Sequence, residues 1–233
     1  MKRFYKQAVA AAVDGGWQVM LDGRGVKTQG GRAQIVPGQP LAEALAAEWA
    51  DQADPIDPAR FMLRDMADYA IDVVAPDPAA AVAALMPFAE TDTLCYRAEA
   101  GEALHRRQTA LWEPLLANAE HRWDIAFTRI DGIIHRPQPA STTARLAAVL
   151  TAHDLFTVAA LRSLAGLSSS MVIALAAIEP EADGEALWNA ANLEEDYQAE
   201  LWGQDSDALA LRTLRLRDFA AAIRFVGLSR DTA

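Results

Sequence analysis

The chain has 233 residues, of which 52% are hydrophobic and 23% are charged, as is usual for a globular protein with a sizeable core. Its net charge of −11 argues against non-specific binding to nucleic acid or anionic lipid. The single cysteine, Cys95, excludes an internal disulfide and favours a reducing compartment. Because no run approaches the roughly 18 apolar residues that a membrane-spanning helix needs, we expect no membrane insertion.

The N-terminal region predicts a small antiparallel sheet between about Phe4 and Val36. WQVML (17–21) and RAQIV (32–36) have strand composition, and the Asp-Gly and Gly-Gly pairs between them are typical of hairpin turns. The opening MKRFYKQA has no apolar stretch behind it, so we expect no secretory signal. We therefore expect a cytoplasmic location in a bacterium; in a eukaryotic host, a mature form in the mitochondrial matrix would look the same.

Helix signals follow the sheet. Pro40 can occupy the first turn of a helix that runs to Gln52, and the pairs Asp57-Pro58 and Asp77-Pro78 repeat this type of start with Asp as the cap. A further helix is expected from about Glu102 to Trp123.

Two segments of the middle region are predicted to be strands, TDTLCYRA (91–98) and IAFTRI (125–130). Strand alternation in the first would place Asp92 on one face, with Cys95 and Arg97 on the other. Buried free cysteines are usually structural, so we expect Cys95 to be a core residue rather than a nucleophile.

The remainder of the chain predicts helices only. Plausible helix caps are Ser141, Asp154, Ser169, Asp183 and Ser206, and Gly227 is a plausible final stop. The fold class is therefore α+β: a small antiparallel β-rich N-terminal region, a mixed middle and a mainly helical C-terminal domain. We place the domain boundary between residues 137 and 138, which gives domains 1–137 and 138–233.

No catalytic constellation is recognisable. The four histidines lack ligand spacing, and the chain has neither a phosphate-binding loop nor a nucleophile elbow. We therefore expect no catalytic residue, no metal and no cofactor.

The acidic stretch LEEDYQAELWG (193–203) stands out within a helix expected from Asp183 to Trp202. A stripe through Leu187 and Ala190 continues onto Glu194, where a core residue would be expected. A desolvated, unpaired carboxylate is costly, which leaves two interpretations. Either Glu194 pairs internally with an arginine of the last helix, or it points into a groove that receives a partner. The candidate arginines are Arg212, Arg215, Arg217 and Arg224.

Several blocks along the chain resemble one protein family, the chaperones that attend the free alpha subunit during assembly of F-type ATP synthase. In chain order they are RFYKQA, GGWQVMLDGRGVKTQGG, LAEALAAEWADQ, RDMADYAIDVV, TDTLCYRAE, QTALWEPLLANAEHRWDIAF and LEEDYQAELWG. Each block is weak alone, but their order is specific. The chain departs from the family after Gly203, where it continues with QDSDALA.

The resemblance implies a non-catalytic, monomeric protein that binds the unassembled alpha subunit, shields its beta-facing surface from aggregation and releases it during assembly of the catalytic head. Glu194, Glu195 and Gln198 fall on the family's acidic block and are the expected partner contacts. Further candidates are Trp202, Asp22, Arg24 and Arg97, although turn chemistry can also explain Asp22 and Arg24. Trp49 and Trp112 are expected in the core.

Two other functions are compatible with the sequence. One is an enzyme that binds a small molecule between the Asp92–Arg97 strand and Glu194. The other is a generic holdase that binds many unfolded clients.

Overall fold

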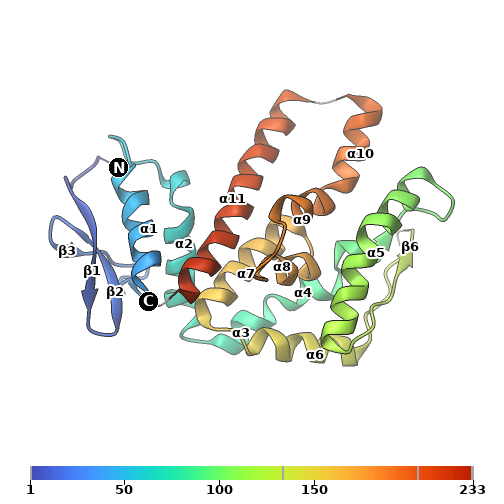
Figure 1. The fold of residues 1–233 in the computed structure, drawn as a ribbon, viewed down its shortest axis with the longest axis horizontal. Coiled ribbons are helices and arrows are strands. Elements are labelled where there is room, and N and C mark those ends of the chain that lie inside the picture. Colours follow the sequence, from blue (N-terminus) through green and yellow to red (C-terminus); the bar gives the residue numbers. More distant parts are fainter. Residues whose placement is uncertain (1, 133, 204, 232–233) are drawn as a thin grey trace. The chain divides into compact units, whose positions relative to one another are not determined.

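The computed structural model describes residues 2–132, 134–203 and 205–231 (Figure 1). Its packing divides the chain into two compact units. Unit 1 contains the residues up to 81, residues 154–160 and the residues from 221 onward, and unit 2 contains residues 82–153 and 161–220. The boundary expected at 137–138 follows the change from mixed to helical sequence and lies inside unit 2, because segments distant along the chain pack together in both units.

Unit 1 contains the expected antiparallel sheet. Strand β2 (Gly16–Leu21) is central and pairs with β1 (Ala8–Val13), β3 (Arg24–Gly25) and β4 (Ile35–Val36). Glycine is required at position 16, since a Cβ atom there would lie 2.4 Å from the carbonyl oxygen of Val36.

Helix α1 (Gln39–Ala50) packs against this sheet and confirms the helix predicted from Pro40. The Trp49 ring is buried, as expected, between the rings of Tyr5 and Phe61, and the Tyr5 hydroxyl donates to the Trp49 carbonyl at 2.6 Å. Asp57 caps a 3-10 turn, η1 (Pro58–Arg60), rather than an α-helix. The α-helix α2 (Met62–Tyr69) follows and continues as the π-helix η2 (Ala70–Val74).

Unit 2 is mainly helical and is built around α5 (Ala103–Trp123), which confirms the predicted long helix. Trp112 of α5 is fully buried, as expected, and its indole N–H donates to the Ala190 carbonyl at 2.8 Å. The other elements that lie within this unit are α4 (Met86–Glu90), η3 (Thr93–Cys95), β5 (Tyr96–Arg97), β6 (Ile130–Asp131), α6 (Ala140–Thr151), α8 (Met171–Ala177), α9 (Gly184–Ala191) and α10 (Leu193–Trp202). Helices α3 (Pro78–Ala83), α7 (Leu155–Ser168) and α11 (Ser206–Arg230) contribute residues to both units. The antiparallel N-terminal sheet and mainly helical remainder confirm the α+β class.

The strand predicted over residues 91–98 is wrong for most of its length, because Asp92 bends the chain. Asp92 is fully buried and its carboxylate accepts from the Leu94 amide at 3.0 Å, which starts the 3-10 turn η3. The same carboxylate accepts from the Ser170 hydroxyl and the Val172 amide at the start of α8, both at 2.9 Å. Only Tyr96 and Arg97 remain extended, so Asp92 and Arg97 do not share one strand.

The strand predicted over residues 125–130 is also wrong except at its end. Only Ile130 and Asp131 pair, in parallel, with β5. The backbone before them is bonded to side chains instead: Phe127 donates to Glu120, Thr128 exchanges bonds with Gln138, and Ala126 exchanges bonds with Thr142. Because these side-chain partners lie several to many residues away, the sequence around residues 125–130 does not show that the backbone is bonded to them rather than to a strand.

Four of the six predicted helix ends differ from the structure. Asp154 and Asp183 cap α7 and α9 as predicted. Ser206 is the first residue of α11, and the side chain before it, Asp205, accepts from the Asp207 amide at 2.7 Å. The cap of α8 is Ser170 rather than Ser169, α6 begins at Ala140 after Pro139, and α11 continues past Gly227 to Arg230.

Among the described residues no single helix is long and apolar enough to cross a membrane. The stretches Met62–Val74 and Pro78–Cys95 meet the length and composition requirement only together, with a bend of 119° between them.

Burial of Asp92 predicts a pH-dependent stability. Burial raises the pKa of its carboxyl to about 6, although the hydrogen bonds from Val172, Ser170 and Leu94 act in the opposite direction. Because this pKa is higher in the folded than in the unfolded chain, the resulting stabilisation is complete below the unfolded pKa and is lost as the pH rises through about 6.

Asp92→Asn removes this titration and turns an amide N–H toward hydrogen-bond donors, so we expect it to lower the free energy of unfolding by about 1–3 kcal/mol. The free energy of unfolding of the wild type should exceed that of the variant by about 1 kcal/mol more at about pH 5.2 than at about pH 7.5, as measured by urea unfolding. A difference that is independent of pH, or that increases toward high pH, would contradict the raised pKa.

Candidate functional site

The acidic stretch forms a helix of its own, so the single helix expected from Asp183 to Trp202 is wrong. Asn192 separates α9 from α10, with φ −106° and ψ 16°, and its side-chain amide donates to the Trp188 carbonyl at 2.8 Å. The break interrupts the predicted apolar stripe. Leu187 of α9 is buried, whereas Leu201 of α10 is 56% exposed.

Glu194 is an exposed residue rather than a core residue, which corrects the position inferred from the stripe. Its Oε1 accepts a hydrogen bond from Nε2 of Gln108 at 2.6 Å. Gln108 is fully buried on α5, and its own Oε1 accepts from the Ala98 amide at 2.8 Å. Within the part of the chain that the structure describes, Glu194 forms no ion pair, so an internal arginine does not hold it.

The other acids of α10 pair with arginines. Asp196 accepts from Nη2 of Arg212 at 2.8 Å, Glu200 pairs with Arg107 at 2.7 Å, and Glu195 lies 3.9 Å from Arg215. The arginines of α11 therefore do bind this segment, but through the neighbours of Glu194. Because none of the residues of α10 is buried, these polar contacts and the Gln108 bond are the main attachment of the helix.

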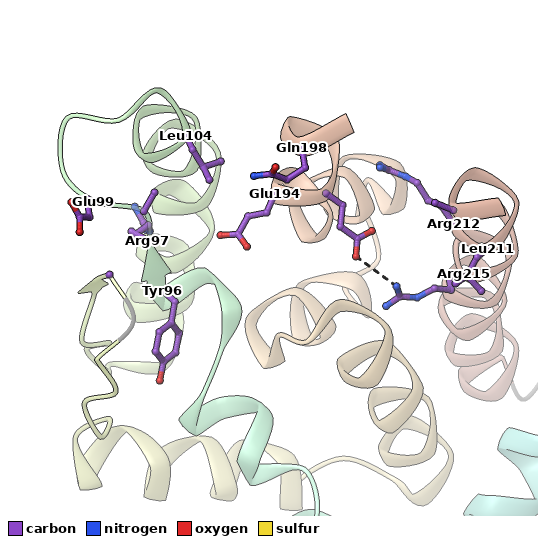
Figure 2. Close-up of a pocket in the computed structure, with 13 residues that line it drawn as sticks. Tyr96, Arg97, Glu99, Leu104, Glu194, Gln198, Leu211, Arg212 and Arg215 are labelled. Carbon is purple, nitrogen blue, oxygen red and sulfur yellow. Dashed lines mark ion pairs between the residues drawn. The ribbon is translucent and has the colours of Figure 1, made fainter. Parts of the chain in front are cut away.

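A cleft of about 1140 Å³ opens beside Glu194 (Figure 2). Figure 2 shows Glu194 and Gln198 pointing from α10 toward the segment that carries Arg97 and Glu99, while Arg212 and Arg215 point from α11 toward α10. Three of the predicted site residues that are close in sequence, Glu194, Glu195 and Gln198, thus line one cavity together with Arg97.

Arg97 forms part of a wall of the cleft, but its guanidinium is buried and bonded to other residues of the protein. Its side chain is 3% exposed, its Nη2 pairs with Glu113 at 3.0 Å, and its Nε donates to the Leu94 carbonyl at 3.1 Å. Hydrogen bonds from Arg129 and from Arg97 hold the pKa of Glu113 below its ordinary value. Arg97 therefore shapes the cleft and positions its wall.

The remaining predicted contacts lie elsewhere. Asp22 has a φ of 47°, and its carboxylate accepts hydrogen bonds from the amides of Gln7 and Lys6. These bonds, that from Gln7 most strongly, lower the pKa of the carboxyl. This is the turn chemistry considered for Asp22. Asp22 and the exposed Arg24 belong to unit 1, whereas the cleft is formed by unit 2 alone. Trp202 is 83% exposed at the end of α10, and its N–H donates to Gln198 at 3.0 Å.

Sequence reasoning missed a set of exposed apolar side chains next to the cleft. No described residue between Leu193 and Asp218 is buried; we call this stretch, α10 with the first half of α11, the arm. Exposed large apolar residues of the arm are Leu201, Trp202, Leu209, Leu211 and Leu214, which we call the apolar tip. The sequence signal is the leucine-rich run ALALRTLRL (208–216), which does not form one helical stripe. Exposed apolar patches are typical of protein-binding surfaces, and the arm carries these five side chains within one segment.

Metal ligands and a reactive cysteine are the two other kinds of site that the residues could form. The described residues contain no group of three or more His, Cys, Asp or Glu side chains able to hold a metal ion. Cys95 is buried, and burial raises the pKa of its thiol to about 12, so it remains a protonated core residue.

The polar attachment of α10 predicts sensitivity to salt. Exposed ion pairs contribute about 0–1 kcal/mol each and are screened at high ionic strength. Raising NaCl from about 0.05 M to about 0.5 M should therefore speed hydrogen exchange of the α10 amides while leaving the buried helix α8 unchanged. Equal protection of α10 at both salt concentrations would contradict this attachment.

The apolar tip should contribute little to stability. Leu214 is 49% exposed, whereas Phe219 on the same helix is fully buried against Trp188 at 5.4 Å between ring centroids. We expect Leu214→Ala to change the free energy of unfolding by less than about 0.5 kcal/mol and Phe219→Ala to lower it by about 3–5 kcal/mol, as measured by denaturant unfolding. A large loss from Leu214→Ala would mean that the tip is packed in solution.

Comparison with known proteins identifies the family. Residues 2–120 match the family described as ATP12 chaperone protein. The mitochondrial protein atp12 of Schizosaccharomyces pombe is 24% identical over 220 residues, which cover 89% of this chain and 75% of that protein. The crystal structure of Atp12 from Paracoccus denitrificans is 34% identical with a TM-score of 0.89 over 98% of each chain. A protein from Agrobacterium tumefaciens is 36% identical with a TM-score of 0.91, covering 97% of this chain and 85% of the other. With a match over half of its length and structural relatives over nearly all of it, the chain belongs to the ATP12 chaperone family.

Proposed function

We propose that this protein is an assembly chaperone of F-type ATP synthase that binds the unassembled alpha subunit, shields its beta-facing surface and releases it during assembly of the catalytic head. The observation that carries the proposal is the arm, an exposed apolar tip beside a cleft that is lined by both acidic and basic side chains, Glu194 among them. Family membership supports a chaperone in ATP synthase assembly rather than an enzyme. We expect it to act as a monomer in the bacterial cytoplasm, or in the mitochondrial matrix for eukaryotic relatives.

The physical demand on such a chaperone agrees with the arm. A subunit of an obligate ring exposes apolar interface before its partner arrives, and such patches aggregate. Leucines and Trp202 of the apolar tip can cover apolar surface, while Glu194, which forms no ion pair among the described residues, can receive a basic residue at the edge of that surface. Burying a carboxylate against a cation favours one client over generic apolar surface.

The competing functions have less support. The small-molecule enzyme needs Asp92, Arg97 and Glu194 in one site. Asp92 is instead hydrogen-bonded to Ser170 and Val172 at the start of α8 and does not line the cleft. Arg97 is bound to Glu113. A generic holdase would also use exposed apolar residues, so selectivity for one client is the property that separates it from the proposed function.

The proposal is tested by co-expressing the alpha subunit of the same organism, without the beta subunit, with this protein or its variants. Wild type should yield a soluble stoichiometric complex. Glu194→Lys should weaken the complex about tenfold or more, since it replaces an acceptor with a like charge for a basic partner. Glu185→Lys, an exposed acid on α9 outside the cleft, is the matched control and should bind as wild type does.

Circular dichroism and thermal unfolding of Glu194→Lys establish that the loss is not a folding defect, and Glu194→Gln separates the charge from the hydrogen bond with Gln108. Alpha subunit that aggregates in the presence of wild type would refute the proposal. Equal protection of an unrelated aggregating protein would favour the holdase instead.

A further inference from the structure

A second groove lies further along α5, and none of its lining residues lines the cleft. It has a volume of about 750 Å³, and α5 forms one wall while the end of α8 and the start of α9 form the other. Apolar or uncharged lining residues include Leu111, Pro114, Asn118, Pro180, Ala182 and Ala186. Leu111 is 39% exposed, so an apolar surface is accessible within unit 2.

The polar groups of this groove are mostly hydrogen-bond acceptors. Pro114 lies inside α5 and has no N–H, so the carbonyl of Ala110, which also lines the groove, lacks its helical donor. Glu179, Glu181 and Asp183 line the opposite wall. Glu179 and Glu181 follow the C-terminal end of α8, where the helix dipole adds partial negative charge, whereas Asp183 is the N-cap of α9.

Most of the negative charge is not neutralised. Arg122 is the cation that lines the groove, and it pairs with Glu179 at 2.9 Å. The Asp183 carboxylate accepts a hydrogen bond from the Ala186 amide, and this uncharged donor does not neutralise its charge. Glu181 is exposed and forms no ion pair within the described ranges. An apolar floor with acceptors along its edges is complementary to an amphipathic segment that carries a cation.

We propose that this groove binds a second segment of the alpha subunit, a short amphipathic segment whose apolar side chains lie on Leu111 and Ala186 and whose lysine or arginine reaches Glu181. The inference rests on the proposed function and adds a separate contact to it. Helix α5 connects the two surfaces, since Arg107, which pairs with Glu200 of the arm, lies one turn before Leu111. Two moderate contacts with the same client give a higher affinity together than either gives alone, and the client can still be released by breaking one contact at a time.

Variants on α9 and in the segment just before it test the groove by the affinity of the purified protein for the alpha subunit. Ala186→Arg fills the groove and supplies a cation to Glu181, and Glu181→Lys reverses the charge at its edge. Both should weaken binding about tenfold. The new arginine competes with the occupant's basic side chain for Glu181, and a lysine at position 181 repels that side chain. The controls Asn189→Arg and Glu185→Lys make the same charge changes at exposed positions outside the groove and should stay within about twofold of wild type.

A photo-cross-linking residue at position 186, with position 189 as the control, identifies the occupant. The expected result is a cross-link from position 186 to an alpha-subunit peptide that contains apolar residues and a lysine or arginine. Groove variants that bind as wild type does while Glu194→Lys does not would overturn the groove and leave the proposed function standing. A cross-link to a second copy of this chain would overturn the groove as well, and failure of wild type to bind the alpha subunit would overturn both.

Discussion

Gln108 determines how the two walls of the cleft are joined. Its side chain is fully buried on α5, where its carbonyl accepts from the Ala98 amide after β5 and its amide donates to Glu194 of α10. A buried amide that bonds through both its oxygen and its nitrogen fixes the direction of each partner. The position of Glu194 is set by this bond, and the ion pairs of Asp196 and Glu200 hold the rest of α10.

The arm combines order with exposure. Helix α11 is anchored where Phe219 packs against Trp188 and where Arg215 donates to the Leu167 carbonyl at 3.1 Å, while the residues before this anchor remain unburied. Helix α10 is attached by polar bonds and ion pairs rather than by apolar packing. Such a surface is ordered in advance but costs little to rearrange, which suits a chaperone that must bind a client firmly and later release it.

The interior of unit 2 supplies the rigidity that the arm lacks. Asp92 joins the start of η3 to the start of α8, and Glu113 and Glu120 both bind Arg129, which holds the segment after α5 against that helix. These buried or half-buried polar contacts link parts of the chain far apart in sequence. They leave α5 as a stable support with the cleft along one part of its surface and the second groove along another.

The sequence by itself determined the α+β class, the N-terminal antiparallel sheet, α1, α5 and the family, because hairpin turns, proline starts and ordered motif blocks are local signals. It also singled out Glu194, Glu195 and Gln198, but placed Glu194 in a core that is absent there. Only the tertiary structure decided that Asn192 breaks the helix, that Asp92 caps rather than extends a strand, and that the leucines of α11 stay exposed. The reason is physical. The bonds of Asp92 reach Ser170 and Val172 far along the chain, and the exposure of the leucines depends on the absence of a packing surface, so neither is written in the local pattern. The break at Asn192 uses a neighbour, Trp188, and the stripe through Leu187 and Ala190 did not reveal it.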